Sequence, residues 1–209
     1  MTAGCRVVVL MAFLGLSACH HGGRRPGAVP PPLAWHDIAT SADRARLHAW
    51  REAWTVALAK VAKSGETRQV VRQAELLQPD AALRDPVPPP GDYRCRTFKL
   101  GAKQAGGLDF VAYQPFTCRI EREGDVLSFA KIGGSQRPVG LLFPDDAKRM
   151  VFLGTMTLGD ESRALDYGRD PERDVAGLLE RVDAERWRLV LPYPHWESTL
   201  DVIELTPTG

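Results

Sequence analysis

The chain has 209 residues, of which 44% are hydrophobic and 25% charged, close to the averages of ordinary globular proteins. This composition excludes collagen-like, coiled-coil and wholly disordered chains. Lys and Arg total 27 against 26 Asp and Glu, so no overall charge draws the chain to nucleic acid. The four cysteines are too few for a disulfide scaffold and lack zinc-site spacing. From the length we expect one domain, or one domain plus an appendage.

The first twenty residues have the pattern of an export signal. Arg6 is the only charged residue before an unbroken apolar run at residues 7–16. As a helix this run is about 15 Å long, roughly half the hydrocarbon thickness of a bilayer, so it predicts a signal peptide and not a membrane span. The run ends in Leu-Ser-Ala-Cys at residues 16–19. These four residues resemble a bacterial lipobox, and an ordinary secretory signal is the alternative.

The resemblance to a lipobox implies cleavage of a signal peptide at residues 1–18 and a lipid anchor on Cys19. Such an anchor makes the membrane a partner of the protein, because two or three acyl chains hold it almost permanently. His20 stands where an Asp commonly retains lipoproteins at the inner membrane. The sequence thus favours the periplasmic side of the outer membrane. The following residues, 19–33, are rich in Pro and Gly and predict an extended tether.

Residues 34–85 predict a helical hairpin. Apolar residues recur every three or four positions over 40–63, and Thr40 or Ser41 is a suitable N-cap for that helix. A second helix is predicted over 66–78, where a proline follows. Two tryptophans, Trp50 and Trp54, lie on the apolar face of the first helix. At helical spacing such residues belong to a core more often than to a ligand site.

From residue 91 onward the apolar residues alternate with period two, which is typical of strands. The segment 170–182 could instead be a helix begun by a proline, but its central glycine and the tight turn after it favour a strand. The predicted fold is α+β, mainly β: the hairpin packs on an antiparallel barrel or sandwich-like meander at 91–209, in a single domain at 34–209. The predicted strands are 92–100, 110–121, 125–132, 138–143, 149–157, 174–182, 186–191 and 199–206.

Two cysteines of the predicted strands have matching positions. Cys95 and Cys118 each lie on the apolar face of a strand, so both side chains point towards the core. We predict a structural disulfide between them, since an exported chain enters an oxidising compartment. On the chain-entropy model this bond stabilises the fold by about 3 kcal/mol. A redox-active pair is the alternative, but it would normally have Cys-x-x-Cys spacing.

Motifs for catalysis are missing from the sequence. It contains no phosphate-binding glycine loop, no His-Glu-x-x-His and no Gly-x-Ser-x-Gly. His195 and Ser198 are the one candidate pair in the β-region, and residues so close in sequence rarely form a nucleophile and its base. We therefore predict no catalytic residue, no metal site and no cofactor, while leaving an enzyme open.

Two polar segments are candidates for a ligand rim. Glycines beside Gln136 and Arg137 permit a tight turn, and Tyr167 and Arg169 precede a stretch of alternating charges. If a barrel mouth is occupied, these four residues are our candidates for its lining. The alternative is that both segments are solvated loops.

Six stretches of the chain resemble an uncharacterised family of exported proteobacterial proteins, domain of unknown function 4893. This resemblance implies that the helices and the β-region form one unit, and it implies no activity, cofactor or partner. A slighter likeness to membrane-bound lysozyme inhibitors rests on a lipid anchor, a small barrel and the Tyr-x-Cys at 93–95. The six stretches are PGDYRCRTFKLGA (90–102), FTCRI (116–120), GSQRPVG (134–140), VFLG (151–154), YGRDPERDVAGLLER (167–181) and RWRLVLPYPHWESTLDVIEL (186–205).

Three hypotheses for the function follow. The preferred one is a non-enzymatic, lipid-anchored periplasmic module that binds an envelope protein, a glycan or a small ligand. The second is an envelope hydrolase that uses His195 with Ser198, which requires both side chains in one pocket. The third is a barrel similar to the lysozyme inhibitors.

The lipid anchor has a direct test. Cys19→Ala removes the only thiol of the lipobox-like run, so we expect an unacylated chain that is either unprocessed or soluble. Fractionation and mass spectrometry of the N-terminus measure both outcomes. A variant that is still cleaved normally and stays in the membrane fraction would show that Cys19 is not the anchor.

Overall fold

The computed structural model describes residues 1, 34–159 and 161–208. The predicted lipid anchor on Cys19 and tether at 19–33 lie outside the described residues, as does all but the first residue of the predicted signal peptide. These three expectations stay predictions. In the part of the chain that is described, no helix is long and apolar enough to cross a membrane.

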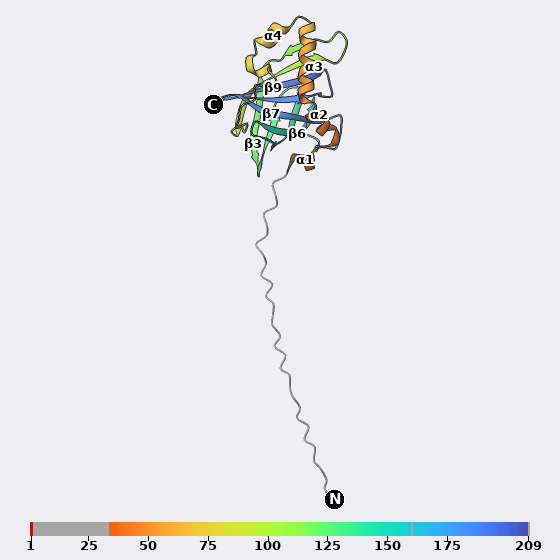
Figure 1. Cartoon of the computed structure of the whole chain (residues 1–209), viewed down its shortest axis with the longest axis vertical. Helices are drawn as coiled ribbons and strands as arrows, with labels where there is room; N and C mark the ends of the chain where they lie inside the picture. The colour runs from red at the N-terminus through yellow and green to blue at the C-terminus, as the bar shows by residue number, and fades with distance from the viewer. Residues whose placement is uncertain (2–33, 160, 209) are drawn as a thin grey trace. The chain divides into compact units, whose positions relative to one another are not determined.

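The described residues form one antiparallel sheet of nine strands, of which eight close into a barrel (Figure 1). Successive strands pair with their neighbours, and the first and last strands of the barrel, β1 and β9, pair over nine register positions. The prediction of a mainly β meander is confirmed, and closure makes it a barrel and not a sandwich. The strands are β1 (Gly91–Ala102), β2 (Phe110–Ala112), β3 (Phe116–Glu123), β4 (Val126–Lys131), β5 (Gln136–Pro144), β6 (Arg149–Leu158), β7 (Asp174–Asp183), β8 (Arg186–Pro192) and β9 (Ser198–Pro207).

The contested segment 170–182 is a strand for most of its length, since β7 begins at Asp174. The central Gly177 has a packing role in this strand. A Cβ at this position would come within 2.6 Å of the Val190 carbonyl oxygen on β8. The glycine therefore permits close approach of two neighbouring strands.

The predicted strand at 110–121 is wrong in one respect, because it is two strands. Pro115 has no N–H to donate, and the ladder stops between β2 and β3. As a result one edge of β1 is shared: β3 pairs with it as far as Cys95, and β2 pairs with it from Phe98 to Leu100. The barrel wall therefore splits beyond Cys95.

Alternate residues of each strand fill the barrel interior, as period two requires. The interior is apolar at the end where β1 begins, and Tyr93 and Trp187 meet there edge to face, with ring centroids 6.2 Å apart. Cys95 and Cys118 form the predicted disulfide in this interior, with Cα atoms 5.9 Å apart. Other members of this core are Ile120, Leu127, Phe129, Leu142, Met150, Phe152, Leu179, Leu189, Ile203 and Leu205.

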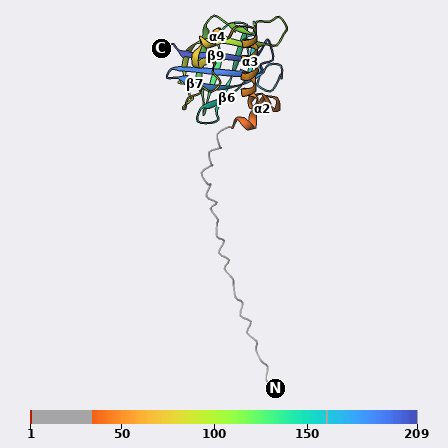
Figure 2. The same ribbon diagram turned by 45° about the horizontal axis from the view of Figure 1, so that its top comes forward.

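The helices cover one outer face of the barrel (Figures 1 and 2). Trp54 is fully buried where α3 packs on β1, β8 and β9, and Trp50 packs beside it. The tryptophan stripe thus belongs to the core of this chain, as its spacing favoured. The helical elements are α1 (Trp35–Ile38), α2 (Ser41–His48), α3 (Trp50–Lys63), α4 (Thr67–Val71) and the 3-10 helix η1 (Ala74–Leu77).

The helical region differs from the predicted hairpin in two ways. The first predicted helix is interrupted at Ala49, so that α2 and α3 are separate, although Thr40 caps α2 by accepting a hydrogen bond from the Asp43 N–H at 3.1 Å. The second predicted helix, 66–78, ends early because Ala74 has φ +46°, a left-handed conformation that an α-helix does not tolerate. The chain bends there into η1.

A buried arginine explains that bend. Arg188 of β8 points out of the barrel, is fully buried, and donates to the carbonyl oxygens of Leu76 (2.8 Å) and Gln78 (2.6 Å). It also pairs with the buried carboxylate of Glu180 at 2.6 Å. Carbonyl oxygens that remained inside a regular helix would be less available to the guanidinium. The charge of Arg188 therefore holds η1 against the barrel.

We expect Arg188→Ala to lower the free energy of unfolding by about 3–5 kcal/mol, because it leaves a buried carboxylate and several carbonyls short of a donor. Arg119→Ala is the matched control: its ion pair with Asp92 is about half exposed, so the loss should be much smaller than that of Arg188→Ala. Urea denaturation of both variants measures the difference. Equal losses would contradict the proposed role of Arg188.

Candidate functional site

A pocket of about 380 Å³ lies where the barrel wall splits. Its wall is built from the second half of β1, the connection between β2 and β3, the ends of β3 and β4, and the start of β5. The loop between β4 and β5, residues 133–135, and the polar end of β9 complete it. We call this cavity the mouth pocket. Its volume is within the range of roughly 300–1,000 Å³ that is usual for small-molecule sites.

Lys99 of β1 is the polar centre of the mouth pocket. Its ammonium group donates to the side-chain oxygen of Gln136 at 3.0 Å and lies 2.7 Å from the carboxylate of Glu197. The carboxylate of Asp201 lies 3.5 Å away on β9. Burial by itself lowers the pKa of Lys99, but the two carboxylates outweigh it and raise this pKa above its usual value. Lys99 is therefore a fixed cation.

Asp201 is the buried partner of this cation. Its side chain is 7% exposed, and it accepts a hydrogen bond from the hydroxyl of Ser198. Burial raises the pKa of Asp201, although Lys99 and Ser198 both favour the charged form. Glu197, by contrast, is half exposed, and its hydrogen bond with Lys99 lowers its pKa. One carboxylate thus belongs to the barrel interior and the other to the rim.

Lys131 is a second cation of the mouth pocket and lacks such partners. Its ammonium group lies 4.3 Å from the centroid of the Phe116 ring. Among the described residues, no carboxylate lies within ion-pair distance of it. Burial lowers the pKa of Lys131, and the positive charges of Lys99 and Arg137 lower it further. The pocket therefore contains one compensated ammonium group and one that is not.

Apolar side chains form the remaining wall of the mouth pocket. They come from five different strands and continue the apolar interior of the barrel towards the opening. A pocket with an apolar wall and a few convergent polar groups is the usual form of a site for a small organic molecule. These side chains are Phe116, Pro138, Met156, Leu191 and Ile203.

Of the four predicted rim residues, the structure places Gln136 in the mouth pocket and the others elsewhere. Arg137 donates to the carbonyl oxygens of nearby loops, among them Gly134 at 2.7 Å. Tyr167 donates to Asp43 at 2.6 Å and thereby supports the start of α2. Arg169 also lies outside the lining of this pocket. One of the four predicted rim residues therefore lies at the site.

Four residues of the mouth pocket were not predicted from the sequence: Lys99, Lys131, Glu197 and Asp201. A signal for three of them is present in the strand pattern, because an inward position of a barrel strand is normally apolar. Lys99 shares the inward face of β1 with Cys95, and Asp201 alternates with Ile203 on β9. Lys131 stands likewise at the end of β4. Charges at such positions indicate a polar site inside the barrel.

The candidate catalytic pair is not assembled. The hydroxyl of Ser198 is engaged with Asp201, while the Nδ1 atom of His195 lies 3.6 Å from the carboxylate of Glu172. His195 and Trp196 line an adjacent hollow of about 410 Å³, which shares Gln136 and Glu197 with the mouth pocket. Burial lowers the pKa of His195. This geometry does not provide the nucleophile–base hydrogen bond that a serine hydrolase needs.

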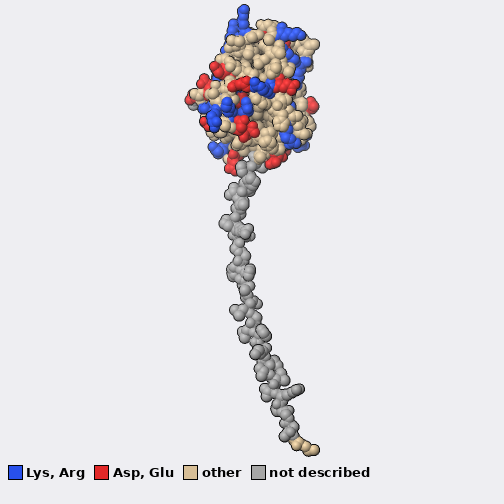
Figure 3. Space-filling model, in the orientation of Figure 1, with Lys and Arg blue, Asp and Glu red and all other residues tan. Residues whose placement is uncertain are grey.

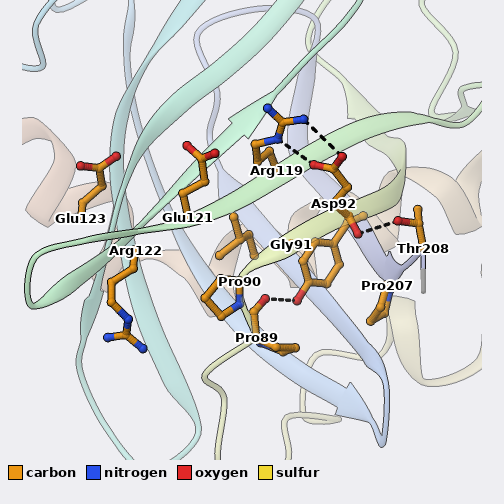
Figure 4. A pocket seen from close by; sticks show the side chains of 12 residues that line it. Pro89, Pro90, Gly91, Asp92, Arg119, Glu121, Arg122, Glu123, Pro207 and Thr208 are labelled. Carbon is orange, nitrogen blue, oxygen red and sulfur yellow. Dashed lines mark hydrogen bonds and ion pairs between the residues drawn. The ribbon is translucent and has the colours of Figure 1, made fainter.

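A larger hollow of about 860 Å³ lies at the other end of β1 (Figure 4). Its charged residues are half exposed: Arg119 donates to Asp92 at 2.7 Å, and the hydroxyl of Thr208 donates to the Asp92 carbonyl at 3.0 Å. Groups so well solvated orient a ligand poorly. The smaller mouth pocket is therefore the stronger candidate, since Lys99 and Asp201 are buried there.

The protein surface gives no sign of a nucleic-acid site in the view of Figure 3, where acidic and basic residues are interspersed. Within the described residues there is also no cluster of three or more His, Cys, Asp or Glu side chains arranged to hold a metal ion. The mouth pocket thus remains the site to interpret.

Comparison with protein-family models gives one match, over residues 35–205, to the family described as Domain of unknown function (DUF4893). The chain belongs to the DUF4893 family. Its match spans the helices and the whole barrel, so the two form one family unit. No curated protein and no solved structure matches the chain. The function of this DUF4893 protein is therefore argued from its own geometry.

We expect Lys99→Met to lower the free energy of unfolding by about 3–5 kcal/mol near pH 7, because Asp201 is left buried without its cation. Burial raises the folded-state pKa of Asp201 above its unfolded value, so protonation favours the folded chain as the pH falls through that pKa. The loss should therefore be smaller at acidic pH than at pH 7. Urea denaturation at the two pH values measures it.

Lys131→Met is the matched control for this variant. It removes an ammonium group that has no carboxylate partner among the described residues, so stability should change by less than about 1 kcal/mol. Equal losses for both lysine variants would show that the Lys99–Asp201 pair has no special role.

Proposed function

We propose that this DUF4893 protein is a non-enzymatic binding module of the bacterial envelope. In this proposal Cys19 carries a lipid that holds the chain on the periplasmic side of the outer membrane, and the barrel takes a small ligand in the mouth pocket. The observation that supports it best is the burial of Lys99 and Asp201 beside an open, partly apolar cavity.

The energetics of that ion pair favour a binding role. Moving two charges out of water costs several kcal/mol for each ion, and an apolar pair of similar volume is often at least as stabilising. Apolar side chains fill the rest of the barrel interior. Inside the barrel the Lys99–Asp201 pair lies beside the cavity, a position that suits orientation of a ligand.

The lipid anchor and the disulfide fit the same compartment. The Cys95–Cys118 bond suits an oxidising space outside the cytoplasm. The lipobox-like residues 16–19 would place the chain on the membrane that borders this space. Binding of a small ligand, and not of nucleic acid, also agrees with the nearly balanced charge of the chain.

Occupation of the mouth pocket is tested with a neutral, polarity-sensitive dye, N-phenyl-1-naphthylamine. We expect the fluorescence of the dye to rise when it binds the wild-type protein. Its affinity should be at least tenfold lower for Thr97→Trp, because an inward indole fills the cavity. Thr117→Trp is the matched control, since Thr117 is an exposed residue of β3, and it should bind the dye normally.

Circular dichroism of both tryptophan variants establishes that each is folded. No dye binding by the folded wild-type protein, or equal binding by folded Thr97→Trp, would contradict a ligand site at the mouth. If Thr97→Trp does not fold, Met156→Trp replaces it, because Met156 lines the same cavity from β6.

A further inference from the structure

We propose that the ligand of the mouth pocket is an amphipathic anion, namely a small carboxylic acid with an alkyl or aryl body, whose carboxylate pairs with Lys131. This inference rests on the proposed binding function and adds the chemical class of the ligand. It depends on a difference between the two ammonium groups in the cavity: Lys99 has two carboxylate partners, and Lys131 has none among the described residues.

The charges of the mouth pocket are not fully balanced by the protein. Glu197 and Asp201 both face Lys99, at 2.7 Å and 3.5 Å. Lys131 faces the same cavity. Its charge-stabilising contact is the Phe116 ring, whose centroid lies 4.3 Å from the ammonium nitrogen. In the described part of the chain no acid lies within ion-pair distance of its ammonium group. An anion in the cavity would supply the missing partner.

The backbone near Lys131 also leaves room for an anion. Lys131 ends β4, and Gly133 and Gly134 follow it along the edge of the cavity. Gly134 has φ +86°, so a side chain is disfavoured at that position, and a Cβ there would lie 3.4 Å from the Lys131 ammonium nitrogen. Without side chains, these glycines leave the ammonium group accessible from the opening.

The apolar wall selects the rest of the ligand. It adjoins the disulfide-containing core, to which Met156, Leu191 and Ile203 belong. The ring of Tyr113, which is 44% exposed, lines the cavity at its opening. An alkyl or aryl group therefore meets apolar surface both within the cavity and at its rim.

Other ligand classes fit these charges less well. A cationic ligand would meet the positive field of Lys131, while the two carboxylates are already engaged by Lys99. A neutral ligand would exclude water from Lys131 and leave this ammonium group without an ionic partner, which costs free energy. An anion gains a charge-assisted hydrogen bond at the same place.

The test compares three probes that share one chain length: octanoate, octan-1-ol and octylammonium. Each displaces N-phenyl-1-naphthylamine from the folded full-length protein. We expect octanoate to bind about tenfold or more tightly than octan-1-ol, and octylammonium to bind more weakly than either. Lys131→Met should remove the preference of octanoate over octan-1-ol, while octan-1-ol binds at least as tightly as to the wild-type protein.

Lys148→Met is the matched control, because it removes the same charge from an exposed turn between β5 and β6, outside the pocket lining. It should keep the preference for octanoate. Dye binding without any preference for octanoate, or a preference that survives Lys131→Met, would overturn the anion proposal and leave the binding function standing. Absence of dye binding by the wild-type protein would instead contradict the binding function itself.

Discussion

Closure of the sheet between β1 and β9 is the constraint on which the rest of the structure depends. These strands pair from Tyr93 with Pro207 to Ala102 with Ser198, so both edges of the meander are satisfied by each other. Closure turns every second side chain inward and every other one outward. The inward set forms the disulfide-containing core, and the outward set of β1, β8 and β9 forms the platform for α3.

The same closure explains why the cavity lies at one end. Because β3 leaves β1 after Cys95 and β2 replaces it, the wall is continuous around the apolar end and split at the other. Inward positions beyond the split border the mouth pocket, where polar side chains find polar partners. Lys99, Lys131 and Asp201 occupy such positions. Strand pairing therefore determines where the mouth pocket lies, and the side chains determine its charge and polarity.

The sequence predicted most of the barrel, since period-two alternation is a local property of each strand. It did not predict the break at Pro115, because a proline in an apolar run is compatible with an edge strand until the pairing is known. The bend at Ala74 was also not predicted. It depends on hydrogen bonds from the distant Arg188, which no local pattern of the helical region reveals. For the site, Gln136 was found from its polar, glycine-flanked segment. The lysines and Asp201 were not, because their partners come together only when the barrel closes.

The central claim is that the mouth pocket, and not the larger hollow near Arg119 and Asp92, takes an amphipathic anion. Backbone amide chemical shifts of the labelled protein, followed by nuclear magnetic resonance during titration with octanoate, test it most directly. The account predicts saturable shifts concentrated at Lys99, residues 131–136 and Asp201. Shifts concentrated at residues 90–92 and 119–123, or no saturable shifts, would contradict it.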